Sequence, residues 1–175
     1  MNCEELHSMI LEGAVAILAR GVEADPVLFC FNEQKQKGDI ISLGEFMHNK
    51  ALAAGFVKVA AKALEATMVG MVIEGWTSQS VAEGRMPFPE GGLATMHDAV
   101  EILVITIETQ EFSRVWIYPI QHNDANQRVL DVDKLVFVDA KVKGEDTYNR
   151  FSVFGWDDAE VRDSLFPPNA VGELS

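Results

Sequence analysis

Asp139 and Lys141, in the segment VFVDAKV, form the pattern in this chain most directly suited to chemistry. They are two residues apart, so on a β-strand both side chains would project from the same face. Asp131 or Asp133, slightly upstream, could add a second carboxylate. Carboxylates of this kind hold a divalent metal ion, while a lysine beside them can steady an attacking hydroxide. The pattern therefore predicts a candidate magnesium-dependent catalytic site.

The acidic-x-Lys pair is similar to that of magnesium-dependent nucleases of the restriction-enzyme type, which would make Asp133, Asp139 and Lys141 the candidate catalytic residues. The charge of the chain opposes nucleic acid as a substrate. It carries 27 acidic residues against 14 basic ones and a net charge of −13, which repels a phosphate backbone unless the bases gather on one face. The alternative interpretation is an edge strand whose outward Asp139 and Lys141 prevent aggregation.

Other patterns for catalysis or metal binding are weaker. His97-Asp98 lacks a second histidine or acidic pair at metal-ligand spacing, and the other histidines are scattered along the chain. Ser78 and Ser80 have no nucleophile elbow around them, and the glycines lack a phosphate-loop pattern. We therefore expect no metal and no cofactor, and Asp98 is better explained as a cap or turn residue.

Arg114, Trp116 and Tyr118 alternate along one expected strand, so all three project from one face. These residue types are the ones most enriched at binding hot spots, and Trp76, at the end of an earlier strand, could join them. The alternative is a core of large aromatic side chains in which Arg114 pairs with an acidic residue across the hairpin.

Residues 77 to 97 separate two very apolar strands and are longer than an ordinary connection. The segment offers Arg85 for anions, Met86 and Phe88 as apolar anchors between prolines, and Gly91-Gly92 as a hinge. It could fold over a small molecule or onto a partner protein. The alternative is an unstructured surface insertion.

Periodicity places the elements around these residues. Apolar residues at three- and four-residue spacing predict a helix over residues 3 to 19, and Ser42 with Glu45 forms a possible capping box for a second, slim and alanine-rich helix. Asp157 could cap a short final helix. The expected strands are residues 27 to 31, 40 to 41, 68 to 76, 100 to 109, 115 to 120, 135 to 142 and 147 to 154.

The strand over residues 100 to 109 is apolar on both faces, since Val100, Ile102 and Val104 alternate with Leu103 and Ile105. Such a strand must be covered on both sides, so the face that helices do not cover requires a third layer or a partner subunit. Pro119 has no backbone N–H for a ladder, which places its strand at an edge or at a break in pairing.

The expected fold class is α+β, with a mostly antiparallel sheet of five to seven strands, helices packed on one face, and the order α-β-β-α-β-β-β-β-β-α. We expect one domain over residues 1 to 175 with a frayed tail at 167 to 175. In order of elements alone, the chain resembles the small α/β sandwiches of the profilin and roadblock type, whose members mostly sense, scaffold or dimerise. Function does not follow from topology.

No stretch approaches the ~20 uninterrupted apolar residues that span a bilayer, and the first residues are acidic where a secretory signal is basic. Cys3 and Cys30 are too few for a disulfide framework. We expect a cytoplasmic protein with reduced cysteines that does not bind membrane or nucleic acid.

The leading functional hypothesis is a non-catalytic interaction or regulatory module that self-associates through its sheet, as a homodimer or with a partner protein. The candidate binding residues are Trp76, Arg85, Phe88, Arg114, Trp116 and Tyr118. The alternatives are the nuclease or phosphodiesterase described above and a small-molecule sensor whose ligand lies beneath residues 77 to 97.

Overall fold

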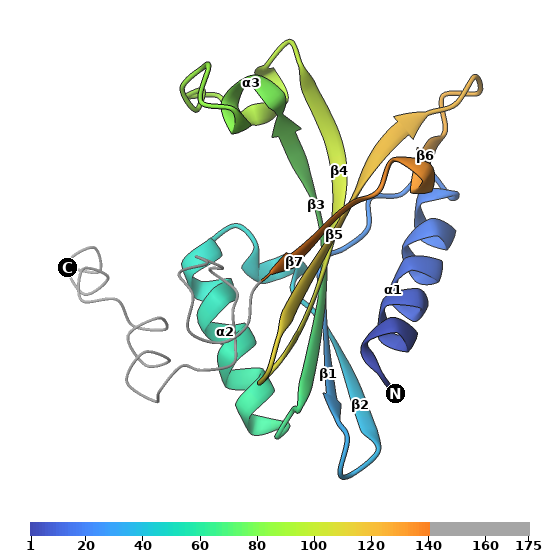
Figure 1. Cartoon of the computed structure of the whole chain (residues 1–175), viewed down its shortest axis with the longest axis vertical. Helices are drawn as coiled ribbons and strands as arrows, with labels where there is room; N and C mark the ends of the chain where they lie inside the picture. Colours follow the sequence, from blue (N-terminus) through green and yellow to red (C-terminus); the bar gives the residue numbers. More distant parts are fainter. Residues whose placement is uncertain (141–175) are drawn as a thin grey trace, which may run out of the picture.

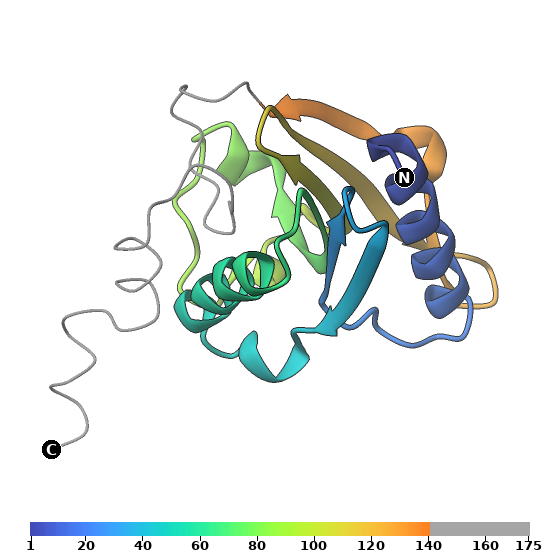
Figure 2. The same cartoon turned by 90° about the horizontal axis from the view of Figure 1, so that it is seen from below.

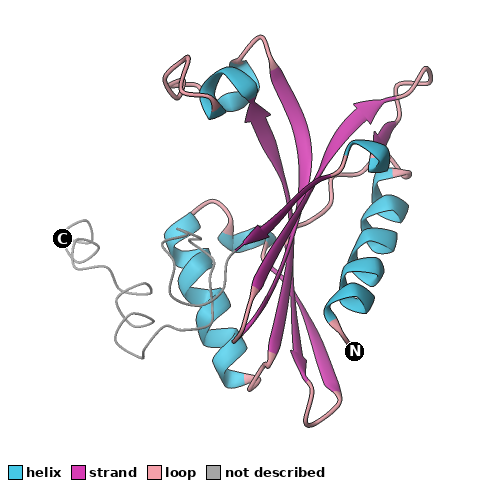
Figure 3. Ribbon diagram, in the orientation of Figure 1, coloured by secondary structure: helices cyan, strands magenta, loops and turns pink. Residues whose placement is uncertain are grey.

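A single antiparallel sheet dominates the computed structural model, which describes residues 1–140 (Figures 1 and 3). The strand order is β2-β1-β3-β4-β5-β6, and β7 also pairs with β5. The α+β class and the antiparallel sheet are confirmed. The predicted strand at 147 to 154, the helix after Asp157 and the tail lie outside the described residues. The strands are β1 (Val27–Asn32), β2 (Lys37–Ser42), β3 (Met68–Ser78), β4 (Ala99–Thr109), β5 (Ser113–His122), β6 (Arg128–Leu130) and β7 (Val136–Ala140).

Two long helices and several single turns complete the described part. The helix α1 (Cys3–Leu18) begins at Asn2, whose side chain accepts a hydrogen bond from the backbone N–H of Glu5 while the Glu5 carboxylate accepts one from that of Asn2. The other elements are α2 (Lys50–Ala63), α3 (Gln79–Ala82) and the 3₁₀ turns η1 (Gly44–Phe46), η2 (Leu93–Thr95) and η3 (Val132–Lys134).

The start of α2 differs from the prediction. Ser42 still belongs to β2, and the turn η1 follows it, so the helix does not begin there. The N-cap is Asn49, whose side-chain oxygen accepts a hydrogen bond from the backbone N–H of Leu52 at 3.1 Å. An Asn side chain accepts from a backbone N–H of the first helical turn, which has no partner within the helix, as well as a Ser side chain does.

The helices lie on opposite faces of the sheet, which corrects the prediction that they pack on one face (Figure 2). Successive side chains of a strand point to opposite faces. In β3, Met68 and Val72 therefore pack in the core beneath α1, while Val69 and Met71 pack in the core beneath α2. A strand that is apolar on both faces allows a helix on each.

The core beneath α1 is the larger of the two. Leu6, Ile10, Ala14 and Leu18 form the buried stripe of the helix, at the spacing that the sequence predicted. Gly70 lies directly below them, and a Cβ atom built on it would be only 2.9 Å from the Ile10 Cδ1 atom. The residues that meet this stripe include Phe31, Leu103, Ile105, Ile107, Trp116, Tyr118 and Ile120.

The second face is covered by α2 over only part of its width. The buried partners of α2 in the sheet lie on β1 and β3, namely Leu28, Cys30, Val69 and Met71. Farther across the sheet, Val104, Val115 and Ile117 project from the same face and are half-buried.

Pro119 confirms the expectation of a break in pairing. The outer edge of β5 pairs with β7 up to Ile117 and with β6 from Ile120 onward, and Pro119 lies between the two. Its carbonyl oxygen accepts a hydrogen bond from the backbone N–H of Asp131 at 2.9 Å, while its nitrogen has no proton to donate.

Candidate functional site

The far ends of β3 and β4 form a two-stranded arm that extends beyond the rest of the sheet (Figure 1). These strands pair over 11 residues, up to Ser78 opposite Ala99, whereas β5 pairs with β4 only as far as Ile102 opposite Pro119. The tip of the arm carries α3 and residues 83 to 98. The predicted long loop is therefore partly helical and sits at the end of a paired ribbon.

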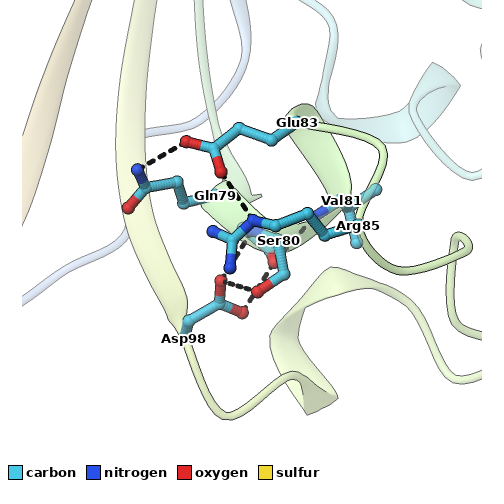
Figure 4. A network of polar contacts seen from close by, with 7 residues as sticks. Gln79, Ser80, Val81, Glu83, Arg85 and Asp98 are labelled. Carbon is cyan, nitrogen blue, oxygen red and sulfur yellow. Dashed lines mark hydrogen bonds and ion pairs between the residues drawn. The ribbon is translucent and has the colours of Figure 1, made fainter.

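Asp98 fixes the tip to the ribbon (Figure 4). The Ser78 hydroxyl donates to its Oδ1 atom at 2.6 Å, and the Ser80 hydroxyl and backbone N–H both donate to its Oδ2 atom, at 2.6 and 2.8 Å. Ser78 and Ser80 are buried. These hydrogen bonds, led by the one from Ser78, hold the pKa of Asp98 well below its ordinary value.

This arrangement explains all three residues without catalysis. Both serine hydroxyls donate hydrogen bonds to an ionised carboxylate, an arrangement that positions a turn and does not activate a nucleophile. Ser78 also caps α3 by accepting from the Val81 backbone N–H. The sequence prediction that Asp98 is a cap or turn residue agrees with this geometry.

Residues 83 to 97 are held by further backbone contacts. The carbonyl oxygen of Ser80 accepts from the backbone N–H groups of both Arg85 and Met86, at 2.9 and 3.0 Å. Gly84 and Gly92 have φ of 69° and 83°, the left-handed region that glycine adopts without a steric penalty. The segment is thus folded back on its own base.

The apolar side chains of this segment nevertheless face outward. Phe88 is 68% exposed and Met86 43% exposed, while Arg85 is exposed and pairs with Glu83 at 2.6 Å. An exposed aromatic side chain on a backbone that is fixed by hydrogen bonds loses little conformational entropy on binding a partner. In both views α3 and this segment lie on the side of the sheet that carries α2 (Figures 1 and 2).

A cluster of charged residues that the sequence analysis did not identify braces the arm from the other side. The Arg128 Nη2 atom donates to Glu74 and to Glu101, each at 2.5 Å, and all three side chains are largely buried. The Glu74 carboxylate also accepts from the backbone N–H of Ala24 at 2.6 Å. β6, β3, β4 and the segment after α1 therefore meet at one arginine. Burial lowers the pKa of Arg128, but the hydrogen bonds that it donates to Glu74 and Glu101, together with their negative charges, raise the pKa above its ordinary value.

The sequence holds a signal for this cluster. Glu74 is in phase with Met68 and Val72, and Glu101 is in phase with Leu103, so both acids point to the face that α1 covers. A carboxylate on a buried face requires a cationic or hydrogen-bonding partner.

The row of Arg114, Trp116 and Tyr118 is brought together as predicted, but α1 covers it. Trp116 is 4% exposed and Tyr118 2% exposed. His7 of α1 stacks on Trp116 with ring centroids 4.3 Å apart, and its Nε2 atom lies 2.9 Å from the Tyr118 hydroxyl. Burial is the main reason that the pKa of His7 is lowered, and the nearby charge of Glu4 raises it. In this structure the row therefore packs against α1.

Arg114 contacts the helix as well, because its Nη1 atom donates to Glu4 at 2.7 Å. Trp76 lies on the arm and is 44% exposed, on the α1 side of the ribbon. Of the six predicted binding residues, Trp76, Arg85 and Phe88 are therefore the exposed ones, and all three lie on the arm.

The candidate catalytic residues are described only in part. Asp133 is exposed in η3, and Asp139 lies on β7 opposite Arg114 of β5. Lys141 lies outside the described residues. Among residues 1–140, no three His, Cys, Asp or Glu side chains are grouped so that they could hold a metal ion.

The chain matches no protein-family model, no curated protein and no solved structure. The likeness in element order to the profilin and roadblock type gains no support from these comparisons. None of the helices in the described part is both long and apolar enough to cross a membrane.

Proposed function

We propose that this protein is a non-catalytic interaction module that self-associates through the second face of its sheet, with residues 83 to 97 beside the contact. The single observation that carries the proposal is the largely apolar face of β4 and β5, which lies beyond the strands β1 and β3 on which α2 packs.

That face has the composition of an interface core. Its apolar side chains are Ile102, Val104, Val115, Ile117 and Pro119, and the uncharged Thr106 lies among them, opposite Val115. Burial of apolar surface is the main favourable term in most protein association. Glu108, in phase with Val104, is buried, so this face exposes little charge, and two copies of a protein with a net charge of −13 can meet there with little repulsion.

The tip of the arm supports the same contact. Met86 and Phe88 are the exposed apolar residues of a segment whose backbone is fixed through Asp98 and Ser80. Because this segment and α2 lie on the same side of the sheet, a partner seated on the β4–β5 face would have the segment that carries Phe88 beside it. Such aromatic anchors contribute a large share of the binding energy in many interfaces.

Sedimentation velocity at tens of micromolar tests the proposal. We expect a dimer that is weakened at least tenfold by Phe88→Ser, which removes an exposed ring, and by Val115→Asp, which places a charge on the face. The matched control is Val15→Asp, since Val15 is 44% exposed on the opposite side of the molecule, on α1. Circular dichroism checks that each variant is folded.

Phe88→Ser changes no buried contact, so it remains informative if Val115→Asp unfolds the protein. A monomeric wild type would refute the proposal, as would an association whose strength neither Phe88→Ser nor a folded Val115→Asp changes.

A further inference from the structure

The strand β2 forms an outer edge of the described sheet. Within residues 1–140 it pairs with β1 alone, in a register that sets Val27 opposite Ser42 and Asn32 opposite Lys37. The tip of the β1–β2 hairpin extends past the ends of both long helices (Figure 1). An edge of this kind presents backbone donors and acceptors to a further strand.

The register shows which backbone groups point outward. The backbone N–H of Leu43 donates to the Pro26 carbonyl at 2.7 Å, which extends the β1–β2 ladder by one pair. Hydrogen-bonded and non-hydrogen-bonded pairs alternate in an antiparallel ladder. Ile41, Asp39 and Lys37 therefore bond to β1, and the N–H and C=O groups of the even-numbered residues Gly38, Ile40 and Ser42 point away from it.

We propose that a second copy of this chain pairs antiparallel along β2, with the two-fold axis at Gly38. Gly38 would then face Gly38 of the partner subunit as a hydrogen-bonded pair, using the outward groups of both. Lys37 would face Asp39 of the partner subunit as a non-hydrogen-bonded pair, in which opposed side chains are closest. This contact is separate from the β4–β5 face and goes beyond the function proposed above.

Charge complementarity sets this register. Lys37 and Asp39 already pair within one chain, with Nζ and Oδ2 3.6 Å apart; Lys37 is exposed and Asp39 is half-buried. Around the axis each lysine would have an aspartate beside it on its own strand and another opposite, so that like charges lie only on the diagonals. Moving the axis by one residue to Asp39 would set Asp39 against Asp39 of the partner subunit, which is destabilising.

The choice of a second copy also follows from the charge of the chain. Two molecules with a net charge of −13 repel one another, so a contact between them requires a surface that is locally balanced. The β2 edge provides one, because the strand carries one lysine and one aspartate, Lys37 and Asp39, and the neighbouring Lys35 pairs with Glu65. Ile40, 68% exposed on the other face of the strand, would lose part of its contact with water in the pair.

Charge reversal with rescue tests this contact in the full-length protein. By sedimentation equilibrium, Lys37→Asp and Asp39→Lys should each weaken the edge dimer at least tenfold, and the double variant K37D/D39K should restore it to within about threefold. Gly38→Pro should abolish the pair, because it removes the outward N–H without taking a hydrogen bond from the β1–β2 ladder. Gly38→Ala is the matched control, since a Cβ atom there meets the Phe31 ring at an ordinary 3.5 Å.

Amide hydrogen exchange of the wild type tests the edge contact without any substitution. With rising protein concentration, the amides of Gly38 and Ile40 should gain protection, while those of Asp39 and Ile41, already bonded to β1, should change little. The variants Phe88→Ser and Val115→Asp should leave this protection intact, which separates the edge contact from the β4–β5 face.

Two results would overturn the edge contact. One is exchange at Gly38 and Ile40 that does not depend on concentration. The other is an association that Gly38→Pro and both single charge reversals leave unchanged, with each variant folded by circular dichroism.

Discussion

The closest approach between α1 and the sheet is at Gly70, and it yields a sharp stability prediction. A Cβ atom on Gly70 would lie 2.9 Å from Ile10 Cδ1, closer than real Cβ atoms essentially ever come, and 3.1 Å from Leu6 Cδ2, which is also a tight contact. Gly70→Ala therefore forces Ile10 into another rotamer or lifts α1 from β3. Overpacking of this kind costs about 1–3 kcal/mol of unfolding free energy.

Gly75 in the same strand provides the matched control. A Cβ atom on Gly75 meets nothing within 4 Å, and neither glycine has a positive φ. Gly75→Ala should therefore be neutral or stabilising by up to about 1 kcal/mol, since alanine reduces the entropy of the unfolded chain. The two substitutions are chemically identical, so opposite signs would isolate the contact with α1.

A second change locates the clash at one atom. Ile10→Val removes the Cδ1 methyl and alone should cost about 0.5–1.5 kcal/mol. Combined with Gly70→Ala it should cost less than the sum of the two single changes, by at least about 0.5 kcal/mol, because the methyl that clashes is gone. Urea unfolding followed by circular dichroism gives the unfolding free energies of the wild type, the two single variants and the double variant. Equal stability of Gly70→Ala and Gly75→Ala, or strict additivity with Ile10→Val, would refute the packing that we describe.

Three further changes probe other parts of the molecule. Asp98→Asn should speed proteolytic cleavage within residues 83 to 97 while leaving the free energy of global unfolding nearly unchanged. The folded pKa of Asp98 is depressed, so its contribution to holding this segment is complete above the unfolded pKa of about 3.9 and is lost as the pH falls through the folded pKa. Acid should therefore accelerate cleavage by an acid-stable protease in the wild type and not in Asp98→Asn. Arg128→Leu should cost about 2–4 kcal/mol in urea unfolding, since Glu74 and Glu101 would remain in a largely buried site without their cation, and a loss under 1 kcal/mol would contradict the bracing role. Burial, helped by the charge of Asp39, raises the pKa of Cys30 to about 11, so iodoacetamide at pH 8 should modify Cys3 first and Cys30 only after unfolding, as mass spectrometry can show.

The elements that the sequence predicted well are those whose apolar pattern is strong. The stripe of α1 and the alternation in β4 both appear at the expected residues. β6 was not predicted, because it has only three residues, Arg128–Leu130, and follows a polar loop. Three residues are too few for the alternation of apolar and polar side chains to be recognised. The start of α2 was misplaced because Ser42 and Glu45 match a capping box, and only the pairing of Ser42 with Val27 excludes it.

The site was predicted less well, for a physical reason. Alternation shows that Arg114, Trp116 and Tyr118 share a face, but the same pattern describes an exposed hot spot and a core row. The decision depends on which face α1 covers, and that follows from tertiary contacts such as His7 on Trp116. Asp98 was predicted as a cap or turn residue from its type, whereas its partners Ser78 and Ser80, about twenty residues earlier, could not be identified without coordinates.

The two proposed contacts use different parts of the sheet, β2 at one edge and the outer face of β4 and β5 farther across it. Each is isologous, so a protein that forms both would assemble beyond a dimer, either as a closed tetramer or as an open chain. Salt should separate them. Screening relieves the repulsion between two copies of charge −13 in either case, but at the edge it also weakens the Lys37–Asp39 pairs. Gly38→Pro retains only the face contact, and Phe88→Ser combined with Val115→Asp retains only the edge contact. The association constant of Gly38→Pro should therefore rise more steeply with salt than that of the combined variant. An equal rise would show that the charges on β2 do not contribute to its pairing.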